Sequence, residues 1–168
     1  MKLAKSTLFL LILLFSFSNF NTPKNNIRII KKNNNTYLYL PQSINFSLNK
    51  TTIDNNCKQQ LHLIIQNLKQ NPTLKIEIGV HNDLRTKEDL SQVRADILKA
   101  FFENYGANPN NINAVGYNVS NLLYNCDDEK VKCSEIEQRA NRRVEIKILN
   151  PNSLEDFIIV NKNSLAVN

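Results

Sequence analysis

The chain is poor in the residues on which many enzyme sites depend. Its 168 residues include only 3 glycines and 2 histidines. So few glycines leave no glycine-rich loop to hold a phosphate group. His62 and His81 are too few for a typical metal site, and no Ser-His-Asp order stands in a plausible context. The sequence therefore predicts a protein that is not an enzyme and binds no metal or cofactor.

Long apolar runs are confined to one segment near the N-terminus. Met1, Lys2 and Lys5 form a short basic start, and the run STLFLLILLFSFSNF follows it. This run is short for a membrane-spanning helix and fits a secretory signal. We therefore expect residues 1–21 to be a signal peptide, with a retained N-terminal anchor as the alternative.

Charge of one sign is only in mild excess. Without Lys2 and Lys5 the exported part has 19 basic and 15 acidic residues, or about +4. The basic residues are scattered, whereas nucleic-acid binders gather them on one face. This balance suits an acidic ligand or a polyanionic surface, and together with export it argues against nucleic acid as a partner.

Cysteine is also scarce, with three in the chain. Cys126 and Cys133 lie close together in NCDDEKVKCSE, without the second pair that a zinc site would need. In an exported chain this spacing predicts a disulfide that closes a short loop. Cys57 lies four residues before Leu61 on the apolar side of a predicted helix, so we expect it to be a buried free thiol.

Apolar spacing predicts strands that alternate with helices. Strands are expected around residues 44–48 and in LKIEIGV, INAVGY and RRVEIKIL. Helices are expected from Ile53 to Leu68, from a Thr86–Asp89 capping box to Tyr105-Gly106, and from a Ser134–Glu137 capping box onward. The resulting β-α-β-α-β-α-β order predicts an α/β two-layer sandwich, in which helices cover one sheet.

Composition divides the chain into four segments. After residues 1–21, residues 22–40 are rich in Asn and Lys and predict a tether that can contribute one edge strand. Residues 41–150 contain the alternating strands and helices and form the predicted domain. Residues 151–168 form a tail, in which DFIIV either adds a strand or packs across the domain.

The second predicted helix carries a charge where an apolar residue is expected. Its core-facing stripe is predicted to be Leu90, Val93, Ile97 and Phe101. Arg94 lies inside this stripe, where a guanidinium is costly unless it is paired. Asp83 follows the end of the preceding strand, so both side chains can share one crevice. Asp83 and Arg94 form either a plain salt bridge or a site for a ligand that carries both an ammonium and a carboxylate.

Three motifs occur in a fixed order: VHND at residues 80–83, LSQVRA at residues 90–95 and NRRVEI at residues 141–146. They stand where the OmpA-like peptidoglycan-binding domain has Gly-His-Thr-Asp, Leu-Ser-x-x-Arg-Ala and its closing strand. The chain resembles this family over about residues 44–149. Its loop CDDEKVKCSEIEQRANRR resembles the cysteine-bridged form found in Bacteroidota. The resemblance implies a mixed sheet covered by helices, in the order β-α-β-α-β-(α)-β.

The resemblance also implies a ligand. In that family the aspartate and the arginine of the first two motifs bind the diaminopimelate of the peptidoglycan peptide stem, without breaking a bond. Carried over, these residues are Asp83 and Arg94. Residues in a supporting role would be His81, Asn82, Asn141, Arg142 and Arg143. Strand alternation separates Arg142 from Arg143, so we expect at most one of them to face the site and the other to be solvated.

The sequence therefore predicts a non-catalytic module that binds peptidoglycan and links the cell envelope to the wall. We expect it in the periplasm, associated with the outer membrane or the cell wall. The alternative is an OmpA-like fold that serves as a protein-interaction module for outer-membrane or periplasmic proteins, with little or no wall binding.

Overall fold

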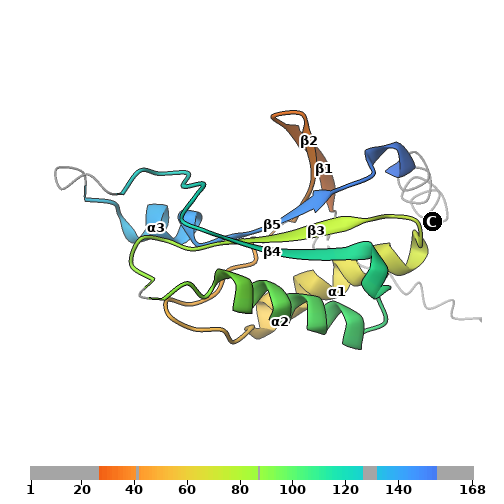
Figure 1. The fold of residues 1–168 in the computed structure, drawn as a ribbon, viewed down its shortest axis with the longest axis horizontal. Coiled ribbons are helices and arrows are strands. Elements are labelled where there is room, and N and C mark those ends of the chain that lie inside the picture. Colours follow the sequence, from red (N-terminus) through yellow and green to blue (C-terminus); the bar gives the residue numbers. More distant parts are fainter. Residues whose placement is uncertain (1–26, 41, 87, 127–131, 155–168) are drawn as a thin grey trace, which may run out of the picture.

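A computed structural model describes residues 27–40, 42–86, 88–126 and 132–154. One five-stranded sheet runs through them in the order β1-β2-β5-β3-β4. Figure 1 shows α1 and α2 together along one face of this sheet, and α3 at one end. The strands are β1 Arg28–Lys32, β2 Asn35–Tyr39, β3 Ile76–His81, β4 Ile112–Asn118 and β5 Val144–Ile148. The helices are α1 Asn55–Gln70, α2 Ser91–Asn104 and α3 Glu135–Asn141, with short 3-10 turns at Pro109–Asn111 and Pro151–Ser153.

The sheet is mixed, as expected. β3 pairs in parallel with β4, and all other neighbouring strands are antiparallel. The parallel pair needs a crossover, which α2 supplies by packing back on β3 and β4. The predicted α/β sandwich with a mixed sheet and helices on it is confirmed.

The core lies between the sheet and the two long helices. Alternate residues of β3 face it, as the LKIEIGV pattern predicts: Ile76, Ile78 and Val80 are buried. The helices contribute side chains that are spaced three or four apart and completely buried: Leu61, Ile64, Leu98 and Phe102. This packing fixes β3 against α2, and so fixes the two motifs that contain Asp83 and Arg94.

Local interactions fix the starts of α1 and α3, and the one at α3 was predicted. Asp54 caps α1 by accepting a hydrogen bond from the Cys57 backbone N–H at 2.7 Å. The capping box of Ser134 and Glu137 is present at the start of α3. These interactions span three residues, so the sequence alone specifies them.

The core strand predicted at residues 44–48 is wrong. Ile44 and Phe46 are buried as expected, but the segment forms no strand. The Phe46 carbonyl accepts from Arg142 Nε at 2.7 Å, and the Ser47 carbonyl accepts from an Arg94 NH2 group at 3.2 Å. Because guanidinium groups use these carbonyls, they are not available to a strand ladder. The place beside β5 belongs instead to β2.

The predicted start and face of the second helix are also wrong. α2 begins at Ser91, and Asp89 accepts from the Ser91 backbone N–H at 3.0 Å rather than closing a capping box with Thr86. Val93 is 49% exposed, so the predicted stripe does not face the core. The buried face is rotated by about one residue and consists of Ser91, Arg94, Ala95, Leu98 and Phe102. Arg94 therefore belongs to the buried face itself.

Two strands lie in the segment that was predicted as a tether with one edge strand. β1 and β2 form a hairpin around Asn33 and Asn34, which both have positive φ angles of 48° and 60°. Asparagine tolerates this left-handed conformation better than most residues, and two such residues suit a tight hairpin. The predicted signal peptide and most of the predicted tail, including DFIIV, lie outside the described residues.

The cysteines behave as predicted. Cys126 and Cys133 form a disulfide, with their Cα atoms 5.4 Å apart. Cys57 is a buried free thiol. Burial raises the pKa of this thiol, which keeps it protonated and unreactive.

Among the described residues, no helix combines the length and the apolar character that crossing a membrane requires.

Candidate functional site

The candidate site lies where β3 ends. The pairing of β3 with β4 shifts between Val80 and His81, and the Asn82 backbone N–H then donates to the Asn118 carbonyl at 2.9 Å. His81, Asn82 and Asp83 are all buried at this strand end. Three consecutive polar residues without exposure need partners inside the protein, because an unpaired buried polar group is costly.

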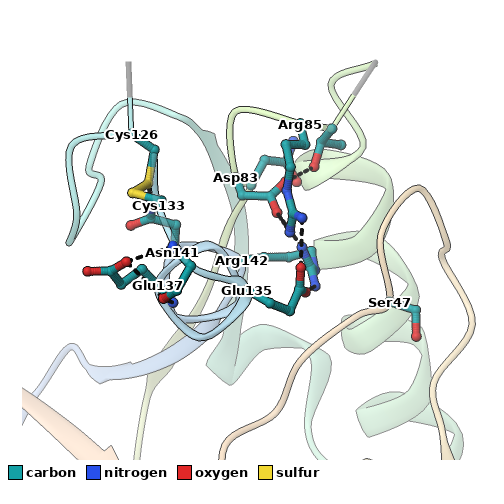
Figure 2. Close-up of polar contacts among 12 residues, drawn as sticks. Ser47, Asp83, Arg85, Cys126, Cys133, Glu135, Glu137, Asn141 and Arg142 are labelled. Carbon is teal, nitrogen blue, oxygen red and sulfur yellow. Dashed lines mark hydrogen bonds and ion pairs between the residues drawn. A yellow bond between two sulfur atoms is a disulfide. The ribbon is translucent and has the colours of Figure 1, made fainter. Parts of the chain in front are cut away.

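Asp83 is completely buried and fully engaged. Thr86 Oγ1 donates to one carboxylate oxygen at 2.8 Å, and an Arg85 NH2 group donates to the other at 3.0 Å. Arg142 forms a close ion pair with that second oxygen. Figure 2 shows Asp83 facing both guanidinium groups, with Glu135 close to them. Glu135 in turn accepts from Arg85 at 2.7 Å.

Arg94 is also completely buried, and every partner that it has here is a neutral oxygen. Its Nε donates to the Lys50 carbonyl at 2.9 Å, and NH1 donates to the Asn82 side-chain oxygen at 2.7 Å. NH2 donates to the Ser47 carbonyl at 3.2 Å, and the guanidinium lies over the Phe46 ring at 5.2 Å. No carboxylate within the described ranges lies at ion-pair distance from Arg94.

Of the two alternatives for Asp83 and Arg94, the plain salt bridge is therefore not formed. Asn82 lies between them, because it binds Arg94 and precedes Asp83 in the chain. Burial lowers the pKa of Arg94, the positive charge of Arg142 lowers it further, and Asp83 raises it. Arg94 thus carries a desolvated positive charge that Asp83 compensates only from a distance.

We refer to five residues at this strand end as the arginine cluster: Asp83, Arg85, Arg94, Glu135 and Arg142. It contains three guanidinium groups and two carboxylates, so its net charge is positive. A guanidinium has five N–H donors, and the contacts of Arg94 described above use three of them. Two N–H donors of Arg94 therefore remain outside these contacts, whereas both oxygens of Asp83 are occupied.

A close approach of β4 to α2 positions Arg94. A Cβ atom on Gly116 would lie 2.3 Å from the Gln92 backbone nitrogen, so only glycine fits here. The Gly116 N–H donates to the Gln92 side-chain oxygen at 2.8 Å, and the Asn118 N–H donates to Ser91 Oγ at 3.1 Å. These contacts hold the first turn of α2 against β4, and so hold Arg94 against the end of β3.

Three of the predicted supporting residues make their contacts outside the arginine cluster: Asn141, Arg143 and His81. Asn141 is buried and binds the backbone of Leu123 and Tyr124, so it holds the loop after β4. Arg143 binds Glu145 at 2.8 Å and is not part of the arginine cluster. Its predicted solvation is wrong, because its side chain is largely buried. Of the paired arginines only Arg142 faces Asp83, as alternation requires. Asn82 does support the site, because it holds Arg94.

His81 points to the sheet face that α1 and α2 do not cover. Its ring stacks on Tyr117, with centroids 5.0 Å apart, and its Nε2 lies 3.5 Å from a Glu145 oxygen. In the described part of the chain neither ring nitrogen has a hydrogen-bond partner. His81 therefore does not contact Asp83 or Arg94.

Two carboxylates complete this second group, which we call the sheet-face cluster: Glu77, His81, Tyr117, Arg143 and Glu145. The contacts with His81 and then Arg143 lower the pKa of Glu145 to about 2. The hydrogen bond that Tyr117 donates to Glu77 at 2.7 Å raises the pKa of Tyr117 to about 12. Within the described ranges no three His, Cys, Asp or Glu side chains are placed to hold a metal ion.

Sequence reasoning missed Arg85 and Glu135. Arg85 follows Asp83 by two residues, so a charge so close to a candidate carboxylate was an available signal. Glu135 comes from α3, and its 50-residue separation from Arg85 left no local pattern to find. The backbone carbonyls that Arg94 and Arg142 use carry no signal in a sequence at all.

Comparison with known families identifies the chain. The model of the OmpA family matches residues 45–135, more than half of the chain, and this range contains both Asp83 and Arg94. The chain belongs to the OmpA family. No curated protein matches this OmpA-family chain significantly.

Solved structures agree with the family. The C-terminal domain of Helicobacter pylori MotB has a TM-score of 0.60 and 20% identity, over 73% of this chain and 96% of that one. The OmpA-like domain of FopA1 from Francisella tularensis has a TM-score of 0.54 and 16% identity, over 77% and 84% of the two chains. The peptidoglycan-associated lipoprotein from Burkholderia pseudomallei has a TM-score of 0.51 and 19% identity, over 64% and 88%. At these identities the likeness shows the OmpA-like fold.

Proposed function

We propose that this OmpA-family protein binds peptidoglycan without catalysis, and that its site takes the diaminopimelate of the peptide stem. Asp83 would receive the ammonium of the diaminopimelate side chain, and Arg94 would receive the adjacent carboxylate. Arg142 would hold Asp83 in place, and Asn82 would hold Arg94. Membership of the family and the fold shared with a peptidoglycan-associated lipoprotein support the general function.

One observation carries the choice of ligand. Arg94 is completely buried, and the described residues supply it with carbonyl and amide oxygens but no carboxylate. A buried cation without an anionic partner is costly, and natural proteins keep such groups where a function uses them. A ligand carboxylate would supply the missing negative charge and accept from the guanidinium donors that remain.

Asp83 indicates the second charged group of the ligand, an ammonium. This carboxylate is buried and already pairs with two cationic groups, Arg85 and Arg142. A group that carries ammonium and carboxylate on one carbon would match both residues at once, with charge-assisted hydrogen bonds at each end. The side-chain terminus of diaminopimelate has this chemistry, whereas lysine lacks the carboxylate.

The same proposal includes location and organisation. The protein would be exported by residues 1–21, held in the periplasm, and associated with the outer membrane or the wall. Residues 22–40 would lead into the binding domain at 41–150, and residues 151–168 would follow it as a tail. Non-catalytic binding is the general behaviour of OmpA-like modules, and the proposal follows it.

Sedimentation with purified sacculi tests the proposal. Wild-type protein should sediment with sacculi that contain diaminopimelate and should stay largely soluble with sacculi that contain lysine at that position. Asp83→Asn should weaken binding by about 2–5 kcal/mol, because it removes the partner of a desolvated charge. Arg94→Lys should weaken it as well, because a lysine keeps the charge but not the two-pronged geometry.

Matched controls separate binding from folding. Asp96→Asn and Arg139→Lys make the same replacements at exposed positions on α2 and α3 and should leave sedimentation unchanged. Circular dichroism should show folded protein for every variant that enters the comparison. Equal sedimentation with both walls would contradict the diaminopimelate site. If the protein ignored both walls, the interaction-module alternative would replace wall binding, and release of soluble wall fragments would instead indicate an enzyme.

A further inference from the structure

Neither oxygen of Asp83 is open to solvent, although the proposed ligand must reach one of them. One oxygen is occupied by Thr86, and the other is shared by Arg85 and Arg142. The whole residue has an exposed fraction of 0%. At least one of these partners has to leave before an ammonium group can bind.

Burial distinguishes the two arginines that share one oxygen of Asp83. The Arg142 side chain is only 6% exposed, and its Nε is fixed to the Phe46 carbonyl. The Arg85 side chain is 37% exposed and comes from the loop that follows Asp83. Arg85 can therefore rotate into solvent without opening the core, whereas Arg142 cannot.

The second contact of Arg85 favours such a movement. Glu135, whose side chain is 66% exposed, accepts from Arg85 NH1 at 2.7 Å. The hydrogen bond with Glu135 raises the pKa of Arg85 more than the one with Asp83 does. An outward rotation thus leaves Arg85 beside a carboxylate at the surface, while Arg142 still neutralises Asp83 from below.

We propose that Arg85 is the resident cation of the Asp83 site and determines which ligands enter it. Its guanidinium occupies the position that the ligand ammonium takes, so binding is an exchange of one cation for another. A neutral or purely anionic ligand cannot make this exchange, because displacing Arg85 would leave Asp83 with one cation fewer in a buried position. This inference rests on the proposed function, since it assumes that Asp83 binds an ammonium.

Binding of a soluble muropeptide, the disaccharide with a diaminopimelate-containing tetrapeptide, tests the exchange by calorimetry. Arg85→Gln removes the resident cation and should tighten binding about two- to fivefold, the range that an exposed ion pair supports. Arg85→Lys keeps a cation near Asp83 and should remain closer to the wild type than to Arg85→Gln. Arg139→Gln, an exposed arginine on α3, should not change the affinity.

The possible outcomes distinguish this inference from the proposed function. Wild-type binding that is equal or stronger than that of Arg85→Gln would overturn the resident cation and leave wall binding intact. Binding by Arg85→Gln alone would support the exchange and show that the wild-type site is closed to this probe. If neither protein bound the muropeptide while both remained folded, the proposed function would fail and the exchange with it. A tighter Arg139→Gln variant would show a general charge effect and would also overturn the assignment.

Discussion

The arginine cluster and the sheet-face cluster come within two residues of each other along the chain, at Asp83 and His81, but they are held together in different ways. In the arginine cluster, Arg94 and Arg142 donate to backbone carbonyls of residues 46–50, which come from a distant part of the chain. In the sheet-face cluster the main contacts join side chains on neighbouring strands, such as Tyr117 with Glu77. The arginine cluster therefore fixes the path of the backbone. The sheet-face cluster lies on a sheet that the hydrogen bonds between its strands already hold together.

This difference changes how each cluster should respond to mutation. Removing a side chain from the arginine cluster leaves buried carbonyls without donors. Removing one from the sheet-face cluster leaves a side chain that can turn toward water, because Glu145 is 30% exposed. Measurements of the free energy of unfolding can separate the two cases. The largest difference should be between variants of Arg94 in the first cluster and Arg143 in the second.

Arg94→Met and Arg143→Met form a matched pair across the two clusters. Arg94→Met should lower the free energy of unfolding by about 3–5 kcal/mol, because it removes three hydrogen bonds to buried oxygens. Arg143→Met should lower it by only about 1 kcal/mol, since its partner Glu145 remains partly hydrated. Urea unfolding followed by circular dichroism measures both values. Similar losses would mean that the two clusters do not differ in their structural role.

The two faces of β3 offer a second pair. Ile78→Ala should cost about 2–5 kcal/mol, because Ile78 is fully buried between the sheet and the helices. Glu77→Gln, one residue away on the other face, should cost about 1 kcal/mol through its weaker hydrogen bond with Tyr117. The same urea series provides the test. A larger loss at Glu77 would show that the sheet-face cluster contributes more than its exposure indicates.

The last prediction concerns the acid response of the sheet-face cluster. The pKa of Glu145 lies near 2 in the folded protein, below its ordinary value of 4.5. Its contribution to stability is therefore complete above pH 4.5 and is lost as the pH falls toward 2. Glu145→Gln should remove about 1–2 kcal/mol of this acid-dependent loss after allowance for solvent screening. Parallel pH dependences of the melting temperature for variant and wild type would contradict the prediction.

Local patterns predicted much of the fold correctly. The periodicity of α1 and β3, the capping box of Ser134 and the disulfide of Cys126 all depend on residues within one or two turns of each other. The face of α2 was misjudged because Arg94 takes a buried position that apolar periodicity assigns to its neighbours, so Val93 was placed inside. A buried arginine is possible here only because distant carbonyls accept from it, and no local pattern contains that information.

The candidate site, too, was predicted only in part. Asp83, Asn82 and Arg94 do gather at the end of β3, as their positions around a strand and the following helix predicted. The alternative of a direct bridge between Asp83 and Arg94 is not realised, because Asn82 accepts from the guanidinium and Arg142 pairs with the carboxylate. That exchange of partners depends on where β5 enters the sheet, a property of the tertiary structure that pair spacing does not specify.

The bonds from Arg142 and Arg94 to residues 46–50 also affect the order in which the chain can become structured. The Arg142 Nε and the Phe46 carbonyl are separated by 96 residues, and Arg94 reaches Ser47 across 47. Contacts of such long sequence separation form late, because a large loop must close first. The β3-α2-β4 unit contains its own pairing and can assemble earlier. A chain that emerges from its N-terminus therefore cannot form the contact between Phe46 and Arg142 until almost all of the domain has followed.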